Sequence, residues 1–146
     1  MRLAHIILSV SLLFISQIAL AEQKISVGKH DLHYNTFPST FLSKEVAATY
    51  QITRSKNRGI LSISVIDTSQ TPTIAVEADI EIIARNLLNQ NKDVKLTKIV
   101  ESNTAIYYLG SFSLNDQEDV NFSITAKPKG SEQVLSVEFS REFFTD

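Results

Sequence analysis

Apolar and polar residues alternate along most of this chain, and this alternation restricts the possible folds more than any other feature. Between Val120 and Lys127 every second residue is apolar, and the residues between them are Asn, Ser, Thr and Lys. A strand directs successive side chains to opposite faces, so this spacing predicts a strand with one buried face. Segments 61–65 and 135–143 repeat the pattern. The sequence therefore favours an all-β fold.

About eight strands of this kind are expected, separated by turn residues at intervals of about 8 to 12 positions. Strands that each bury one face require a second sheet to cover them, which predicts an antiparallel β-sandwich, either immunoglobulin-like or a flattened barrel. One short helix is expected near residues 43–50, capped by Ser43. The predicted strands cover residues 25–27, 31–37, 60–67, 74–85, 94–100, 104–113, 120–127 and 135–143.

The segment 77–90 fits two kinds of secondary structure. Residues alternate from Ile74 to Arg85 as in a strand, whereas Ile80, Ile83 and Leu87 also share one side of a helix. We predict a strand to Arg85, because the alternation begins well before the helical stripe does. A helix remains the alternative for this segment.

The first 21 residues have the three parts of a secretory signal peptide. Met1-Arg2 supplies a positive start, residues 6–18 are mostly apolar, and Ala19-Leu20-Ala21 is a small-x-small end. Cleavage is expected after Ala21, which leaves residues 22–146 as a single β-sandwich domain that does not span the membrane. Export without any cysteine favours a bacterial periplasm over a disulfide-rich extracellular setting. An uncleaved amphipathic anchor is the alternative interpretation.

The charge of the expected mature chain argues against nucleic-acid binding. Loss of Arg2 with the leader leaves 13 of the 14 Lys and Arg residues against 16 Asp and Glu residues, a net charge of about −3. Proteins that bind nucleic acids usually carry a basic stripe. We therefore predict no nucleic-acid partner.

Few residues suggest catalysis or metal binding. His30 and His33 lie three positions apart and so point to opposite faces of a strand, which predicts no metal site. The chain has no cysteine, no Gly-x-Ser-x-Gly motif and only four glycines, so neither a nucleophile nor a phosphate-binding loop is indicated. The carboxylates of Glu77, Asp79 and Glu81 fit the solvated face of a strand. No catalytic residue and no cofactor are predicted, and the sequence favours a protein that is not an enzyme.

The segment Arg54–Gly59 is the best candidate for binding. Arg54, Lys56 and Arg58 follow one another at a spacing of two, so in an extended conformation their cations would point the same way, with the Asn57 amide beside them. Such a group suits a carboxylate or phosphate. The alternative is structural: these cations protect a sheet edge or pair with the carboxylates of segment 77–81. Tyr107 is a further candidate binding residue, because its ring is expected to line a surface groove.

Four motifs in this order after a signal peptide resemble a family of small exported Gram-negative proteins, domain of unknown function 4426. They are Tyr34-Asn35-Thr36-Phe37, Arg54-Ser55-Lys56-Asn57-Arg58-Gly59, Asn86-Leu87-Leu88-x-Gln90 and Ala105-Ile106-Tyr107-Tyr108. The resemblance covers nearly the whole mature chain. It implies a periplasmic all-β domain, supports a strand near Asn86, assigns no activity and transfers no site residue.

Three functions follow as hypotheses. The first is a binding or accessory module of the cell envelope that recognises an anionic small ligand or an envelope protein. The second is a small hydrolase or isomerase with a site built from Tyr, Arg and carboxylates, which requires a deep pocket and a perturbed pKa. The third is an inhibitor or assembly factor that acts by strand addition, which requires an unprotected sheet edge.

Overall fold

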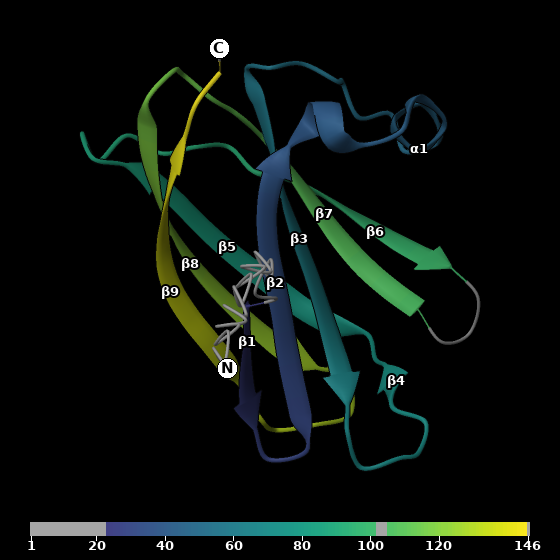
Figure 1. Ribbon diagram of the computed structural model, residues 1–146. Coiled ribbons are helices and arrows are strands. Elements are labelled where there is room, and N and C mark those ends of the chain that lie inside the picture. Colours follow the sequence, from purple (N-terminus) through teal and green to yellow (C-terminus); the bar gives the residue numbers. More distant parts are fainter. Residues whose placement is uncertain (1–22, 102–104, 146) are drawn as a thin grey trace, which may run out of the picture.

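Two antiparallel sheets pack face to face in the computed structural model, which describes residues 23–101 and 105–145 (Figure 1). The predicted antiparallel β-sandwich is confirmed, and its sheets do not close into a barrel over these residues. The larger sheet has the order β1 (Gln23–Val27), β2 (His30–Pro38), β3 (Arg58–Asp67), β7 (Ala105–Ser113), β6 (Lys95–Glu101), and β4 (Ile74–Ala75) pairs with β3. The smaller sheet has the order β5 (Ala78–Asn86), β8 (Glu118–Pro128), β9 (Leu135–Phe143).

The main core lies between the two sheets and follows the predicted alternation. On β8, Val120, Phe122, Ile124 and Ala126 are buried. They face the buried inner residues of the larger sheet, among them Phe112, whose ring meets that of Phe122 edge-on at a centroid distance of 5.3 Å. The alternation therefore identified the buried face of this strand correctly.

A second, smaller core covers part of the outer face of the larger sheet. The chain between β2 and β3 forms the short helices η1 (Ser39–Phe41) and α1 (Lys44–Thr49), and Ser43 caps α1 by accepting a hydrogen bond from the Val46 amide at 3.1 Å. This confirms the predicted helix near residues 43–50. The segment places Ile52 against Ile60, Ile99 and Leu109 of the sheet. Strand β7 carries apolar residues on both faces, as is typical of a strand that is covered on both sides, and this outer core covers part of its second face.

The ambiguous segment is a strand, as predicted, but it is broken rather than continuous from residue 74 to 85. Ile74 and Ala75 pair with β3 in the larger sheet, whereas Ala78–Asn86 pairs with β8 in the smaller one. The chain crosses from one sheet to the other at Val76 and Glu77. Ala75 before the crossing and Ala78 after it both pack in the one core, so the apolar pattern contained no sign of the break.

Two predicted features lie outside the described residues: the leader at residues 1–21 and the turn at Ser102-Asn103, which the sequence places as a hairpin between the predicted strands 94–100 and 104–113. Over residues 23–101 and 105–145, the helices are too short and too polar to cross a membrane.

Gly59 makes room for the ring of Phe112. A Cβ at this position would lie 2.5 Å from Cζ of Phe112, which is fully buried, so the ring would have to shift within the core. We expect Gly59→Ala to lower the free energy of unfolding by about 1 to 3 kcal/mol, because it overpacks the core. Urea unfolding followed by circular dichroism measures this change. Gly130→Ala is a poor control because its φ is +75°, so Ser136→Ala on the exposed face of β9 serves instead, and an equal loss in both variants would contradict this role of Gly59.

Candidate functional site

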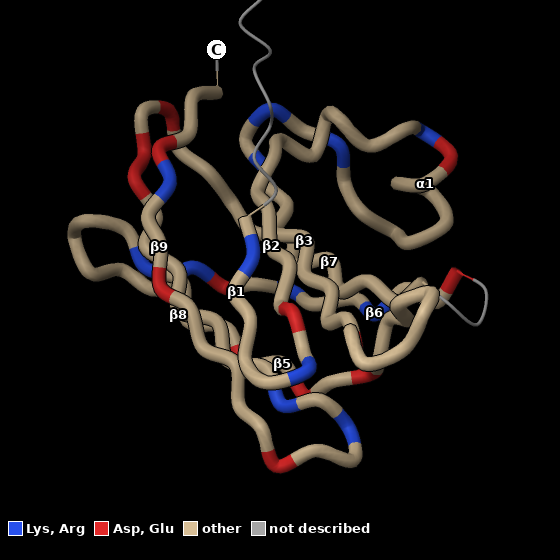
Figure 2. Tube along the Cα trace, turned by 60° about the horizontal axis from the view of Figure 1, so that its bottom comes forward, with Lys and Arg blue, Asp and Glu red and all other residues tan. Residues whose placement is uncertain are grey.

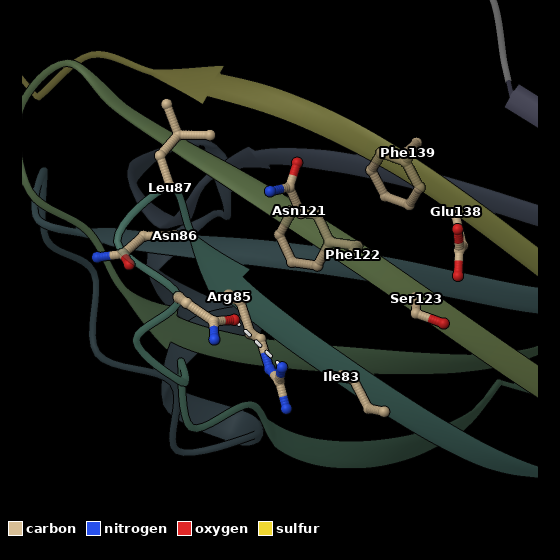
Figure 3. A pocket seen from close by; sticks show the side chains of 10 residues that line it. Ile83, Arg85, Asn86, Leu87, Asn121, Phe122, Ser123, Glu138 and Phe139 are labelled. Atoms are coloured by element: carbon tan, nitrogen blue, oxygen red, sulfur yellow. Dashed lines mark hydrogen bonds between the residues drawn. The ribbon is translucent and has the colours of Figure 1, made fainter.

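The outer face of the smaller sheet carries a hollow of about 670 Å³ (Figure 3). Arg85 and Glu138 both line this hollow, so it contains one positive and one negative side chain. The Arg85 guanidinium is already engaged: its Nε donates to Asn91 Oδ1 at 3.0 Å and its Nη1 to Asn89 Oδ1 at 3.2 Å. These bonds hold the turn after β5, which gives Arg85 a structural role.

A second cavity, of about 530 Å³, has the composition of an anion site. We call it the cationic pocket. It lies between the segment after α1 and the outer face of strands β3, β7 and β6. Its charged lining residues are Arg58 and Lys95, and no carboxylate lines it. Within the described parts of the chain, neither cation forms an ion pair. The remaining lining residues are Thr49, Tyr50, Gln51, Ile52, Thr53, Thr97 and Ser111.

Strand register brings the two cations together. Ser111 of β7 stands opposite Ile60 of β3 on one side and opposite Lys95 of β6 on the other. Arg58 precedes Ile60 by two residues, so its side chain emerges on the same face and its Nη1 donates to Ser111 Oγ at 2.9 Å. Arg58 and Lys95 therefore flank Ser111. This hydrogen bond fixes one edge of the guanidinium and leaves its other donors available.

The opposite wall of the cationic pocket is the segment that follows α1. Its position is fixed by Ile52, which is buried in the outer core and whose amide donates to the carbonyl of Ala47 at 2.8 Å. Gln51, with φ of 54°, makes the turn that reverses the chain there. The pocket thus stands on three paired strands and an anchored loop, a rigid setting for recognition.

The predicted binding residues do not form one site. Arg58 begins β3, but the four residues before it are loop rather than strand, so the predicted extended row of three cations is absent. Figure 2 marks the Lys and Arg positions in blue along the trace. Arg54 instead donates to the carbonyl of Thr40 at 2.8 Å and holds η1. Lys56 and Asn57 are exposed in a turn. Of these four residues, Arg58 alone lines the cationic pocket.

The structural alternative for the basic residues of segment 54–58 is that they pair with the carboxylates of segment 77–81, and the structure gives two of those carboxylates other partners. The carboxylate of Glu77 pairs with Lys98 at 3.0 Å, and that of Asp79 pairs with Lys129. Among the described residues, no ion pair joins the cations of segment 54–58 to the carboxylates of segment 77–81. Sequence reasoning missed Lys95, whose side chain shares a strand face with Thr97 and whose distance from Arg58 along the chain hid their proximity.

Tyr107 lies on the same face of the larger sheet but lines different cavities, with His33 and Ser64. His33 Nε2 is 3.9 Å from Asp31 Oδ2, and His33 is paired in register with Ser64. These three residue types occur in hydrolase triads. The Ser64 hydroxyl, however, donates to the carbonyl of Ile106 at 3.1 Å, so its proton points away from the imidazole. Over residues 23–101 and 105–145, no cluster of three or more His, Asp or Glu side chains could hold a metal ion.

Comparison with known proteins identifies relatives of the whole domain. Residues 24–146 match the family described as domain of unknown function DUF4426. A crystal structure of a DUF4426 family protein from Pseudomonas aeruginosa is 30% identical and superposes with a TM-score of 0.74, covering 86% of this chain and 96% of that one. These findings confirm the resemblance to this family.

More distant structures add nothing to the assignment. The GAE domain of GGA2p from Saccharomyces cerevisiae is 8% identical over 82% of this chain and 94% of that chain, with a TM-score of 0.36. The yeast GGA1 GAE domain is 11% identical over 82% of this chain and 98% of that chain, with a TM-score of 0.37. No curated protein matches the sequence.

Proposed function

This chain belongs to the DUF4426 family, and we propose that it is a periplasmic, non-enzymatic binding module of the cell envelope that recognises the anionic group of a small ligand in the cationic pocket. An envelope protein that presents such a group is the corresponding macromolecular partner. The N-terminal segment supports export, since it has a positive start, an apolar middle and a small-x-small end at Ala19–Ala21. The cysteine-free composition agrees with a bacterial periplasm.

The observation that carries this proposal is the arrangement of Arg58 and Lys95 in a cavity without a carboxylate. A guanidinium matches the planar geometry of a carboxylate or of two phosphate oxygens, and an ammonium adds a charge without a fixed direction. The hydroxyls of Ser111, Thr97 and Thr53 offer further donors in the same cavity. A small anion would therefore replace the counter-charge that these two cations lack in the described structure.

The hydrolase or isomerase alternative is less well supported. A general acid at neutral pH needs a carboxyl whose pKa is raised. The carboxyl groups with a shifted pKa in the described chain, Asp31, Glu45, Asp67 and Glu118, all have a lowered one. In Asp67, hydrogen bonds from Ser69 are the main cause and lower the pKa to about 2. Such groups act as acceptors, which fits binding better than acid–base chemistry.

Strand addition is also less well supported, because the four outermost strands of the two sheets carry charged side chains and the remaining edge strand, β4, is only two residues long. Lys24 lies on β1, and Lys95, Lys98 and Glu101 lie on β6. Glu138, Arg141 and Glu142 lie on β9, and Asp79, Glu81 and Arg85 on β5. The end of β5 is covered in addition by the returning chain, where the Lys92 amide donates to the carbonyl of Ala84 at 2.8 Å. Charges and covered edges both oppose pairing with another chain.

Calorimetric titration with inorganic phosphate and with citrate tests the anion site. We expect at least one of these anions to bind the mature chain, and Arg58→Gln to weaken that binding by about 10- to 100-fold, the equivalent of one lost charge-assisted hydrogen bond of about 1.5 to 3 kcal/mol. Lys95→Gln should weaken it in the same direction. Because Lys95 is exposed, its loss should change the unfolding free energy by less than about 0.5 kcal/mol.

The matched control is Lys56→Gln, which removes the same charge from an exposed turn outside the cationic pocket. It should leave the affinity within about twofold of the unmodified chain, since screening reduces the influence of distant exposed charges. Equal losses in Lys56→Gln and Lys95→Gln would show that only net charge matters and would refute the pocket as the site. Absence of binding to either anion would refute the proposed recognition of small anions.

A further inference from the structure

The larger sheet divides into a fork on the side away from α1. Strand β3 pairs with β7 as far as Ile63, opposite Tyr108, and then changes partner to β4, where Ile66 stands opposite Ala75. The start of β7 therefore separates from β3, and β4 takes its place. The Ser64 hydroxyl of β3 reaches across the fork and donates to the carbonyl of Ile106 on β7 at 3.1 Å. A fork of this kind opens a recess that a regular sheet does not have.

A cavity of about 350 Å³ occupies this fork on the outer face of the sheet. We call it the fork cavity. Tyr107 lines it from β7, with a side chain that is 40% exposed, and Thr73 lines it from the segment before β4. Asp31, His33 and Ser64 line it from β2 and β3. A smaller hollow of about 80 Å³ continues it along β2 and shares Tyr107, His33 and Ser64. No lining residue of either hollow belongs to the cationic pocket.

Hydrogen bonds within the protein leave the fork cavity rich in acceptors. The Ser64 hydroxyl donates its proton to the carbonyl of Ile106, and the hydroxyl of Thr68, which also lines the fork cavity, donates its proton to the carbonyl of Lys29 at 3.0 Å. Each hydroxyl oxygen keeps lone pairs that can accept. Asp31, an acceptor through both oxygens, is held ionised by the Lys24 ammonium at 2.7 Å and by the Ser26 hydroxyl. A ligand for this cavity can therefore donate hydrogen bonds to these oxygens, and the negative charge of Asp31 disfavours an anion beside it.

We propose that the fork cavity is a second binding site, for a neutral saccharide, whose ring lies on the face of Tyr107 and whose hydroxyls donate to Ser64, Thr68 and Asp31. A sugar ring combines an apolar C–H face with several hydroxyl donors. The exposed phenol ring of Tyr107 can pack against the C–H face of the sugar. The acceptors around the ring can accept hydrogen bonds from the sugar hydroxyls. This ligand chemistry is opposite to that of the cationic pocket, so the two sites are independent.

Amide chemical-shift mapping with three neutral tetrasaccharides tests the site: tetra-N-acetylchitotetraose, cellotetraose and maltotetraose. We expect at least one to shift the amides of Tyr107, Ser64 and Thr68 in a saturable way. Tyr107→Ala should weaken that binding by at least roughly tenfold, which is the effect of losing about 1.4 kcal/mol of ring contact. Tetragalacturonate, which carries four carboxylates, should not shift these amides.

Two further variants distinguish a loss of saccharide binding from a loss of folding. Thr73→Ala alters an exposed residue of the fork cavity and should weaken saccharide binding, whereas Lys95→Gln should leave it unchanged. Both variants should give a dispersed amide spectrum like that of the unmodified chain. The proposal is overturned if none of the three neutral saccharides causes saturable shifts, if the shifts cluster at Ser111 and Thr97, or if Tyr107→Ala binds as tightly as the unmodified chain.

Discussion

Glu118→Ala is expected to lower the free energy of unfolding by about 3 to 5 kcal/mol. The side chains of Glu118 and Lys92 are 7% and 8% exposed, and the Lys92 ammonium lies 2.6 Å from Glu118 Oε2. Removal of the carboxylate leaves that ammonium buried without a counter-charge. The remaining partners of the carboxylate, the amide of Asn115 at 2.9 Å and the side chain of Asn86 at 3.1 Å, lose their acceptor as well. These contacts join the start of β8 to the end of β5.

The pH dependence of Glu118 gives a second readout. Burial by itself raises the pKa of this carboxyl, but hydrogen bonds from Lys92, Asn115 and Asn86 outweigh burial and hold the pKa below its ordinary value of 4.5. A lowered pKa in the folded state means that the stabilisation is complete above pH 4.5 and is lost as the pH falls through the folded-state value. The difference in unfolding free energy between the unmodified chain and Glu118→Ala should therefore narrow in that acidic range.

The control for this ion pair is Glu132→Ala. Glu132 pairs with Lys127 at 3.1 Å, but its side chain is 98% exposed, so its loss should change the unfolding free energy by less than about 1 kcal/mol. Urea unfolding followed by circular dichroism measures both variants. A Glu118→Ala protein as stable as Glu132→Ala would show that the buried network contributes no more than a surface pair.

Phe122→Ala is expected to lower the free energy of unfolding by about 3 to 5 kcal/mol through the cavity that it leaves. The Phe122 ring is 2% exposed and lies between the two sheets. It stacks on Phe139 at a centroid distance of 5.0 Å and meets Phe112 edge-on at 5.3 Å. Its loss removes contacts to both sheets at once, because Phe112 belongs to β7 and Phe139 to β9.

Phe41→Ala is the matched control, because it removes the same side chain from a position that is 77% exposed. It should change the unfolding free energy by no more than about 0.5 kcal/mol. Differential scanning calorimetry compares the two variants directly. Similar melting temperatures for both would contradict the placement of Phe122 in the shared core.

Alternation predicted the strands well because it reports which face of a strand is buried. It does not report which strand lies beside which. The break at Val76 and Glu77 was missed for this reason: Ala75 and Ala78 bury side chains in the same core while they pair in different sheets. The outer core was indicated only by the apolar residues on both faces of β7, and its cover, the loop that contains Ile52, left no periodic signal.

The sequence predicted one of the two cations of the cationic pocket, Arg58, and missed the other, Lys95. Arg58 stood out because three cations occur together, but the loop conformation of residues 54–57 separates them. Its neighbour Lys95 lies 37 positions further along the chain, and their meeting depends on β7 being inserted between β3 and β6. Local spacing contains no information about that order. The ion pair of Lys92 and Glu118 was hidden in the same way.

Chemical-shift mapping of the mature chain with inorganic phosphate and citrate tests the central claim, recognition of an anion in the cationic pocket, most directly. We predict saturable shifts that concentrate on the amides of Tyr50, Thr97 and Ser111, and their disappearance in a chain that carries both Arg58→Gln and Lys95→Gln. Shifts that centre on Lys56 and Asn57, or that persist in the double variant, would contradict the claim.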